Sequence, residues 1–373
     1  MSEKKESVSK LGLAAVTAGT LFTALSRLLT SPFHPHGAPT FKRDVMYAAS
    51  RAQLRNMTLA QEKHLEVPTD KAYLDVCKAR GVQPEVIVLS NGKKVNWIGR
   101  RSSKYVLVYL HGGGYVAPAT PGHFAYLSDL TTLLNAAGHD ISTCILSYTL
   151  APQAQYPTQL AETSVLINFL LSNESRSANS LLIAGDSAGG NLCLALLSHI
   201  LHPHPSAQVP RVDLKGESLK ATVLISPWVS FADADHSFKS NAQTDVFDAK
   251  PLIRWSSAWL GQSPSSGPPV GDEYAEPRRA SADWWEGAAE VAGDVLIWGG
   301  GGEIFVDGIQ EFAWKFAEGY NRGAGKEGRK RGRCELVISP REPHEAPILD
   351  VILGFKEKEH GARAIEGWVQ SKL

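Results

Sequence analysis

The chain has 373 residues, of which 43% are hydrophobic, and its 38 basic residues balance 38 acidic ones. This length and composition are typical of a globular protein with one large α/β domain or two ordinary ones. A chain without net charge has no global field that would attract nucleic acid, so we expect no nucleic-acid partner. The four cysteines have neither metal-ligand nor disulfide spacing, which favours a reduced, cytoplasmic protein: Cys77, Cys144, Cys193 and Cys334.

The N-terminal segment allows three interpretations. Residues 11–26 carry no charge, but this stretch is shorter than the roughly 20 residues that cross a bilayer. It could be a signal peptide, a single membrane anchor, or an amphipathic helix on the domain or on a membrane surface. A helix-like pattern continues over residues 42–63, which favours a helical region of the folded protein. We therefore expect residues 1–80 to form a helical cap, with residues 11–29 as the candidate for membrane association.

Strand-like and helix-like segments alternate in the expected catalytic core, residues 81–373. The apolar runs suited to strands are EVIVLS, KVNWIG, YVLVYL, STCILSY, LLIAG, ATVLISPW, DVLIWGG and CELVIS. Segments of helical period lie between most of them, at Ala125–Ala136, Gln159–Leu171, Asn191–Ile200 and Ile309–Ala317. This alternation predicts a mostly parallel sheet of about eight strands with helices on both faces. The Asn91-Gly92 pair predicts a hairpin, so the sheet should be mixed at its first edge.

Three other stretches stand apart from this alternation. Residues 232–290 are rich in Trp, Pro and Asp, and an insertion at this place predicts a lid over a site. Six basic residues lie between Arg322 and Arg333, where a solvated glycine-rich loop is the favoured interpretation over an anion-binding site. The His-Pro-His pairs at 34–36 and 202–204 lack a carboxylate or cysteine to complete a metal set, so we expect neither a metal nor a cofactor.

The run YVLVYLHGGGYVAPA ends a predicted strand and continues through His111 into three glycines. Glycines leave backbone amides unshielded, so the amides of Gly112 and Gly113 can point at an oxyanion. A flexible turn is the alternative. Loops of this HGGG type supply oxyanion N–H groups in lipases and esterases.

The run LLIAGDSAGGNLCLALLSHI contains the pattern G-x-S-x-G at Gly185, Ser187 and Gly189. Small neighbours allow a sharp turn from strand to helix that exposes the serine hydroxyl at the carboxyl edge of a sheet. The helix N-terminus then offers free N–H groups to a developing negative charge. A tight turn capped by a hydroxyl is the alternative, but an apolar strand before the pattern and a helix after it favour a nucleophile.

Five motifs occur together in the order found in a known family: HGGGY, SYTLAPQAQYP, GDSAGGN, LISPW and HEAPIL. Over about residues 84–355 the chain resembles the hormone-sensitive-lipase-type branch of the α/β-hydrolase family, in particular its fungal carboxylesterase relatives. One departure is Thr149, which stands where the family has an arginine. The resemblance implies an α/β-hydrolase fold with a helical lid, and a triad in the chain order serine, acid, histidine.

The triad residues follow from this order. Ser187 is the expected nucleophile, and His344 is the expected base because it follows the last predicted strand, where a loop can carry it over the serine. In LIWGGGGEIFVDGIQEF, Glu303 occupies the family's first acidic position, where most relatives have Asp, and Asp307 occupies the second. We expect Glu303 to be the acid, with Asp307 as the alternative or as a cap for the following helix.

The expected chemistry is acyl transfer from a small or medium-sized ester, an acetylated metabolite or a lactone, as in fungal natural-product pathways. Amides of Gly112, Gly113 and Ala188 would hold the oxyanion, and water would then release the acyl group from Ser187. The same triad would serve an acyltransferase or a ring-opening or ring-closing enzyme. A ligand receptor is a weaker alternative, because the plant gibberellin receptors that resemble this family lack the histidine. A homodimer and a peripheral or single-anchor membrane association are both compatible with the sequence.

Overall fold

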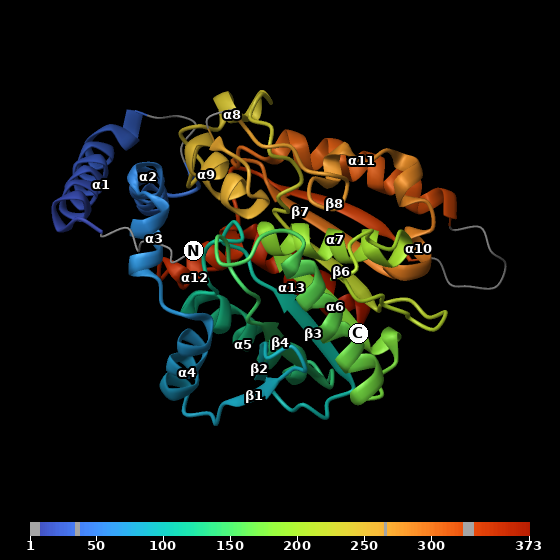
Figure 1. Ribbon diagram of the computed structural model, residues 1–373. Coiled ribbons are helices and arrows are strands. Elements are labelled where there is room, and N and C mark those ends of the chain that lie inside the picture. Colours follow the sequence, from blue (N-terminus) through green and yellow to red (C-terminus); the bar gives the residue numbers. More distant parts are fainter. Residues whose placement is uncertain (1–7, 34–37, 265–266, 324–331) are drawn as a thin grey trace.

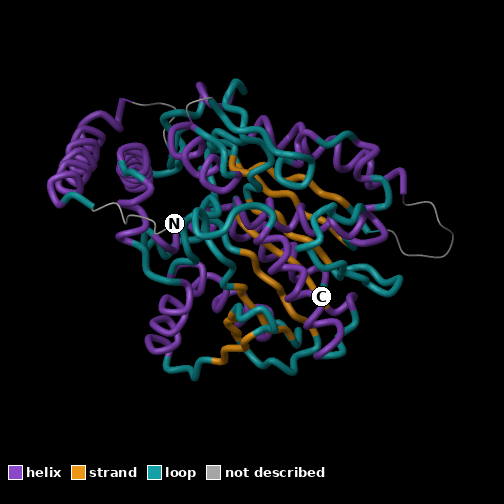
Figure 2. The backbone as a smooth tube through the Cα atoms, viewed as in Figure 1, coloured by secondary structure: helices purple, strands orange, loops and turns teal. Residues whose placement is uncertain are grey.

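A central sheet of eight strands organises the molecule (Figures 1 and 2). The computed structural model describes residues 8–33, 38–264, 267–323 and 332–373. The strands are β1 (Glu85–Val88), β2 (Lys94–Ile98), β3 (Tyr105–Leu110), β4 (Ile141–Leu146), β5 (Leu181–Asp186), β6 (Ala221–Ile225), β7 (Asp294–Gly300) and β8 (Cys334–Ser339). Each coincides with one of the eight apolar runs, so the predicted strands are confirmed.

The sheet has the order β1-β2-β4-β3-β5-β6-β7-β8. Strand β2 pairs antiparallel with both β1 and β4, whereas all pairs from β4 to β8 are parallel. The turn between β1 and β2 is closed by a hydrogen bond of 2.8 Å from the Leu89 amide to the Lys93 carbonyl. The mostly parallel sheet with a mixed first edge is thus confirmed.

Helices cover both faces of the sheet because successive strand residues point to opposite sides. In β3, Val106, Val108 and Leu110 enter one hydrophobic cluster, and Leu107 and Tyr109 enter the other. The first cluster is covered by α6 (Thr158–Asn168), α7 (Ala188–Leu201) and α11 (Val306–Gly323). The second is covered by α4 (Thr69–Arg80), α5 (Pro121–Ala136), α12 (Ala346–Ile352) and α13 (His360–Lys372).

Several helix ends differ from those predicted. Helix α7 starts at Ala188, three residues before the predicted start, because Gly189 and Gly190 hide the helical pattern although they lie in its first turn. Helix α11 extends beyond the predicted end to Gly323. Most of the basic stretch that follows it, residues 324–331, lies outside the described residues.

The N-terminal residues form a separate layer of helices: α1 (Lys10–Thr30), α2 (Phe41–Asn56) and α3 (Leu59–Leu65). This layer is drawn in blue beside the sheet in Figure 1. Between α1 and α2, Arg27 and Asp44 form a buried ion pair with an N–O distance of 2.7 Å. Arg43 of α2 binds Asp350 of α12 at 2.8 Å, with both side chains buried. Removing one partner of such a buried pair typically costs about 3 to 5 kcal/mol. The first pair therefore fixes α1 to α2, and the second fixes the layer to the core.

Residues 232–290 form irregular structure with short helices, among them α8 (Ser237–Ser240), α9 (Ala249–Leu260) and α10 (Ala288–Val291). This segment contacts the N-terminal layer through charged groups. Arg55 of α2 pairs with Asp248 at 2.7 Å, and Arg254 of α9 pairs with Glu62 of α3. The two regions expected to form a cap are therefore in direct contact.

Candidate active site

The loops that follow β3, β5, β7 and β8 carry the candidate catalytic residues. These four strands are parallel, so their carboxyl ends meet at one edge of the sheet. Ligands of open α/β sheets bind in the crevice outside this edge. The sequence-predicted residues are thereby brought to the same side of the molecule.

Ser187 lies in the turn between β5 and α7. Its backbone has φ 48° and ψ −115°, a conformation that costs a residue with a side chain roughly 1 to 3 kcal/mol. The turn is held from both sides, because the Ser187 amide donates to the Ile225 carbonyl at 2.9 Å and the Ser187 carbonyl accepts from the Trp228 amide at 3.0 Å. The serine is 7% exposed. A strained but fixed turn of this kind presents the hydroxyl at the end of the strand.

The small residues around Ser187 are required by close packing. A Cβ atom at Gly189 would lie 1.9 Å from the carbonyl oxygen of Leu110, the last residue of β3. A Cβ atom at Gly185 would lie 2.4 Å from the backbone of Gly189. Neither distance is sterically allowed, so the first turn of α7 can approach β3 only with glycine at these positions.

The HGGG loop continues directly from β3. Gly113 has φ 103°, a backbone conformation that side chains rarely allow. The loop is fixed by His111, whose ring stacks on Tyr148 with centroids 4.2 Å apart, and by the Tyr148 hydroxyl, which donates to the His111 carbonyl at 2.7 Å. Trp255 of α9 packs on the loop, since a Cβ atom at Gly114 would lie 2.7 Å from its ring. The amides of Gly112 and Gly113 therefore belong to a rigid segment.

His344 and Glu303 form a hydrogen-bonded pair. Nδ1 of His344 lies 2.8 Å from Oε2 of Glu303, while Oε1 of Glu303 accepts from the Gly300 amide at 2.6 Å and from the Ser226 hydroxyl at 3.1 Å. Both residues are buried, at 2% and 0% exposure. The ring of His344 also contacts Phe247 and Phe305, with centroids 4.7 and 5.0 Å away. These contacts fix the orientation of the ring and leave Nε2 facing away from the acid.

Asp307 does not contact His344. It lies in the first turn of α11, and its carboxylate accepts from the Ser237 amide, at the start of α8, with a distance of 2.8 Å. The predicted alternative was a cap for the helix that follows, α11. The structure differs from this prediction, because the amide that Asp307 binds belongs to α8 and not to α11. Of the two acids weighed from the sequence, Glu303 is the one beside the histidine.

Asp245 is a buried site residue that sequence reasoning missed. One carboxylate oxygen accepts from the His344 amide at 3.0 Å, and the other accepts from the Ile304 amide at 2.7 Å. Asp245 thus ties the loop that carries the histidine to the loop that carries Glu303. Burial raises the pKa of Asp245 to about 6, and the charge of Glu303 acts in the same direction. No motif in the surrounding stretch NAQTDVFDAK signals this role.

Asp186 and Asn191 are buried polar residues beside the serine that bind neighbouring elements. Asp186 accepts from the Tyr109 hydroxyl at 2.6 Å and lies 3.2 Å from Nε2 of His123. Burial alone would raise the pKa of Asp186, but the charge of His123 and its hydrogen bond outweigh burial, and the pKa lies below its usual range. Asn191 donates to the carbonyls of Trp228 and Ala275 at 2.7 and 2.8 Å.

Glu345 is a second carboxyl group next to the histidine. Its Oε1 atom lies 3.4 Å from Nε2 of His344, on the side of the ring opposite Glu303. Burial opposes protonation of His344, but the two carboxylates outweigh it and raise the pKa of His344 to about 10. No role was predicted for Glu345 from the sequence, although its position directly after the histidine was a usable signal.

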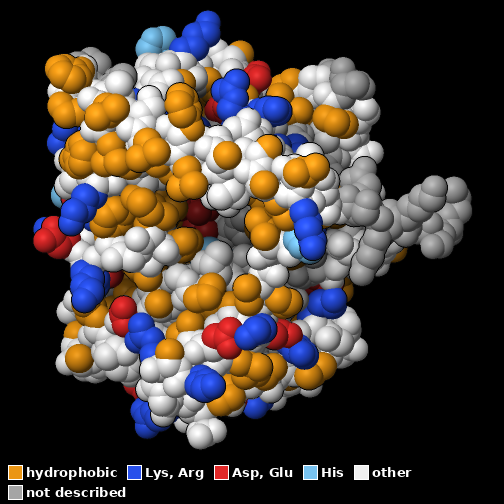
Figure 3. Space-filling model, turned by 90° about the vertical axis from the view of Figure 1, so that its left-hand side faces the viewer, with side chains coloured by type: hydrophobic (Ala, Val, Ile, Leu, Met, Phe, Trp, Pro, Cys, Tyr) orange, Lys and Arg blue, Asp and Glu red, His pale blue; other side chains and the backbone are white. Residues whose placement is uncertain are grey.

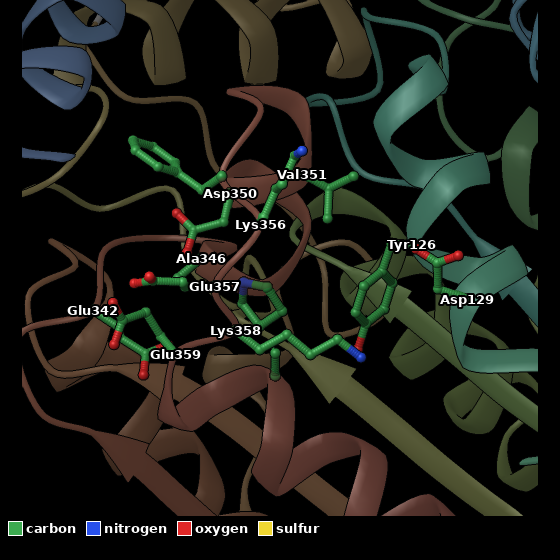
Figure 4. A pocket seen from close by; sticks show the side chains of 13 residues that line it. Tyr126, Asp129, Glu342, Ala346, Asp350, Val351, Lys356, Glu357, Lys358 and Glu359 are labelled. Atoms are coloured by element: carbon green, nitrogen blue, oxygen red, sulfur yellow. The ribbon is translucent and has the colours of Figure 1, made fainter. Parts of the chain in front are cut away.

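The hollows shown in Figures 3 and 4 lie at different places on the molecule. Figure 3 shows one near the middle of the face that lies to the left in Figure 1, with acidic and histidine atoms at its bottom. Figure 4 shows a different cavity, of about 270 Å³, beside α12. Tyr126, Glu342, Asp350 and Lys358 line this cavity, but Ser187 does not. The cavity in Figure 4 is therefore separate from the candidate active site.

Comparisons with known proteins agree with this architecture. A family model described as the alpha/beta hydrolase fold matches residues 107–327. The chain is 29% identical over 166 residues to arylacetamide deacetylase of Bos taurus, which covers 43% of this chain and 39% of the relative. It is 25% identical over 164 residues to steryl acetyl hydrolase 1 of Saccharomyces cerevisiae, covering 43% and 36%. The matched region thus spans well under two thirds of either relative.

The fold also resembles solved structures. One is the crystal structure of an esterase from the bacterial hormone-sensitive lipase family, with a TM-score of 0.59 and 21% sequence identity. The comparison covers 98% of this chain and 99% of the other. At this identity the likeness shows the fold alone.

Proposed function

Because this chain belongs to the α/β-hydrolase family, we propose that it is a serine carboxylic-ester hydrolase of the hormone-sensitive-lipase-type branch, with Ser187, His344 and Glu303 as its triad. The observation that carries the proposal is the pair of Glu303 and His344, joined at 2.8 Å at the same edge of the sheet as the strained turn of Ser187. A serine hydroxyl needs a base, and the base needs an orienting carboxylate. Ser187, His344 and Glu303 are the residues that would fill these three roles.

In the proposed mechanism, neutral His344 accepts the proton of Ser187 through Nε2 while the serine oxygen attacks the ester carbonyl. The negative charge that develops on the carbonyl oxygen is held by the amides of Gly112, Gly113 and Ala188. His344 then protonates the leaving alcohol, and water repeats the sequence on the acyl-enzyme. Glu303 keeps the proton of the neutral ring on Nδ1, which leaves Nε2 free to act as the base.

We further propose that the acyl group is short, with acetyl esters of apolar alcohols as the preferred class. Two relatives are named for the removal of acetyl groups. The aromatic rings of Phe247 and Phe305 pack directly against the base, which leaves little room beside it. We expect residues 1–80 and 232–290 to form the cap that contacts the alcohol, because their ion pairs hold them together above the HGGG loop.

Ser187→Ala tests the hydrolase directly. We expect a loss of about 10⁴-fold to 10⁶-fold in the hydrolysis of p-nitrophenyl acetate, because triad members act as a unit. Ser180→Ala, at a hydroxyl remote from the site on the surface turn before β5, is the matched control and should retain full activity. A Ser187→Ala protein with even a tenth of the wild-type rate would contradict the assignment. Comparison of acetate, butyrate, octanoate and palmitate esters tests the acyl preference, which predicts the fastest turnover for acetate.

A membrane-associated N-terminal helix is also part of the proposal. Helix α1, together with the short helix that follows it, is long and apolar enough to cross a bilayer. Only 6% of its most apolar stretch of 18 residues is buried inside the protein. Three large side chains on its outer surface are mostly exposed: Phe22 at 75%, Leu25 at 61% and Leu29 at 77%. Figure 3 looks onto this side of the molecule, where hydrophobic side chains gather. An exposed apolar helix of this kind can bind the surface of a membrane or anchor in it.

A further inference from the structure

Glu345 is placed where the proposed mechanism needs a free nitrogen. Its Oε1 atom lies 3.4 Å from Nε2 of His344, the atom that must accept the serine proton. Within the described part of the chain, neither of these two buried atoms has a hydrogen-bond partner. In this structure, His344 therefore lies between two carboxylates, with Glu303 at one ring nitrogen and Glu345 at the other.

The backbone of Glu345 shows that this placement is imposed. Glu345 has φ 54° and ψ 26°, a left-handed conformation that costs a residue other than glycine or asparagine about 1 to 2 kcal/mol. The conformation is fixed by the Glu345 amide, which donates to the Ser226 hydroxyl at 3.1 Å. Ser226 also donates to Glu303, so one hydroxyl orients both carboxyl residues around the ring.

The carboxyl group of Glu345 also reaches the oxyanion loop and the buried Asp186. A Cβ atom at Gly112 would lie 2.5 Å from Oε1 of Glu345 and 2.2 Å from Oδ2 of Asp186. The two carboxyl groups therefore meet above Gly112. Two carboxylates so close repel each other, which favours protonation of one of them unless a cation such as the imidazolium of His344 lies beside them.

We propose that Glu345 is a positioning residue of the hydrolase, which pairs with Nε2 of His344 in the free enzyme and releases it when substrate enters. The inference rests on the proposed function. In the paired state the ring is an imidazolium and cannot act as a base. On release, the proton moves from Nε2 to the Glu345 carboxylate, which gives a neutral ring and a carboxylic acid that can donate to Asp186. The Nε2 lone pair is then free to accept the Ser187 proton.

The charges around the pair are consistent with this exchange. Burial raises the pKa of Glu345 to about 7, with Asp186 acting in the same direction and His344 against it. The other titratable groups that face the pair are Glu303 after β7 and Asp245 before α9. Behind Asp186 lie His123 of α5 and Tyr109 of β3. A carboxyl group with a raised pKa accepts a proton from a neighbouring imidazolium more readily than an ordinary glutamate does, so the proton can move to Glu345 when substrate displaces the pairing.

Glu345→Gln removes the charge and keeps the size of the side chain, which gives a pH prediction. Without this carboxylate the pKa of His344 falls, so the ring is neutral at lower pH. The acid limb of kcat/KM should then move to lower pH by about 1 to 3 units, the usual effect of a single charge at this distance. Glu342→Gln is the matched control, because Glu342 is a buried carboxyl of the same loop that binds the Gly361 amide. Its pH profile should equal that of the wild type.

A titration of His344 followed by ¹⁵N NMR measures the effect of Glu345 on the ring independently of enzyme activity. The His344 signal is identified as the one that is missing from the spectrum of His344→Gln. The imidazolium signal of the wild type should persist to higher pH than that of Glu345→Gln. If Glu345→Gln does not fold, Glu345→Gly is the substitute, since glycine suits the left-handed backbone. Equal titration midpoints for His344 in the wild type and the folded variant would overturn the proposal. An active Ser187→Ala would instead overturn the hydrolase assignment and leave the NMR result intact.

Discussion

The imidazole of His344 is constrained at both of its nitrogens and by two aromatic rings. Glu303 faces Nδ1, Glu345 faces Nε2, and Phe247 and Phe305 contact the ring. A ring held on so many sides has little freedom to turn. A change in one of the flanking acids should therefore alter the protonation of His344 more than its position.

Glu303→Gln tests whether Glu303 is the acid of the triad. The variant keeps the size and hydrogen bonding of the side chain but removes the charge that stabilises protonated His344. We expect kcat to fall by at least about 10²-fold, since the equivalent change in a serine protease with intact geometry costs roughly 10⁴-fold. Asp307→Asn is the matched control, because Asp307 binds the Ser237 amide and does not contact the histidine. Hydrolysis of p-nitrophenyl acetate by the two variants gives the ranking, and the reverse order would assign the acid to Asp307.

Residues of the site differ in how visible they are in the sequence. Ser187 and His344 could be predicted, because Ser187 lies in a nucleophile motif and His344 follows the last predicted strand, in the chain order that a triad requires. Glu303 and Asp307 lie four positions apart, and only the start of α11 at Val306 separates a loop residue from a helical one. Asp245 could not be identified, because its role arises from contacts with backbone amides of distant loops. Glu345 could have been noticed as the neighbour of His344, but its contact with the ring nitrogen is visible only in the structure.

The strands were predicted more accurately from apolar runs than the helices were from helical periodicity. All eight runs are strands, because a buried parallel strand needs continuous apolar residues. The start of α7 was missed because its first turn is glycine-rich, and one of these glycines, Gly189, is required by the approach of α7 to Leu110. In this turn, tertiary packing determines the residue types more strongly than helix propensity does.

Helix α1 carries a prediction of its own. Combined substitution of Phe22, Leu25 and Leu29 by serine should abolish flotation of the protein with phosphatidylcholine vesicles. Each side chain loses about 1.5 to 3 kcal/mol of apolar transfer energy, so partition should fall by at least about 10²-fold. Leu74→Ser is the matched control, because Leu74 is 46% exposed on α4 and lies outside the apolar surface of α1.

The folded structure should survive these changes, because the three side chains are exposed while the buried pair of Arg27 and Asp44 remains intact. Circular dichroism provides that check. A triple variant that still floats with the vesicles would contradict a membrane role for this surface of α1, as would a wild-type protein that does not float.

At the scale of the whole molecule, one set of contacts joins the N-terminal helices to the catalytic loops. Arg51 of α2 donates to the backbone carbonyl of Asp245. Asp245 in turn binds the amides of His344 and Ile304, and the neighbouring Thr244 donates to the Gly302 carbonyl at 2.7 Å. The region expected to be a cap thus also supports the acid and the base. The sequence predicted the core, whereas this connection depends on contacts between residues 58 to 194 positions apart in the chain.

Ser187 should form a covalent intermediate in the proposed mechanism, and labelling by a fluorophosphonate measures whether its hydroxyl is activated for that reaction. A fluorophosphonate reacts with a serine only where a base and an oxyanion site activate the hydroxyl. Mass spectrometry of the digested wild-type protein should find one phosphonyl group, on the peptide that contains Ser187, and labelling should disappear in Ser187→Ala and fall strongly in His344→Gln. An unlabelled wild-type protein, or a label on a different serine, would contradict the account.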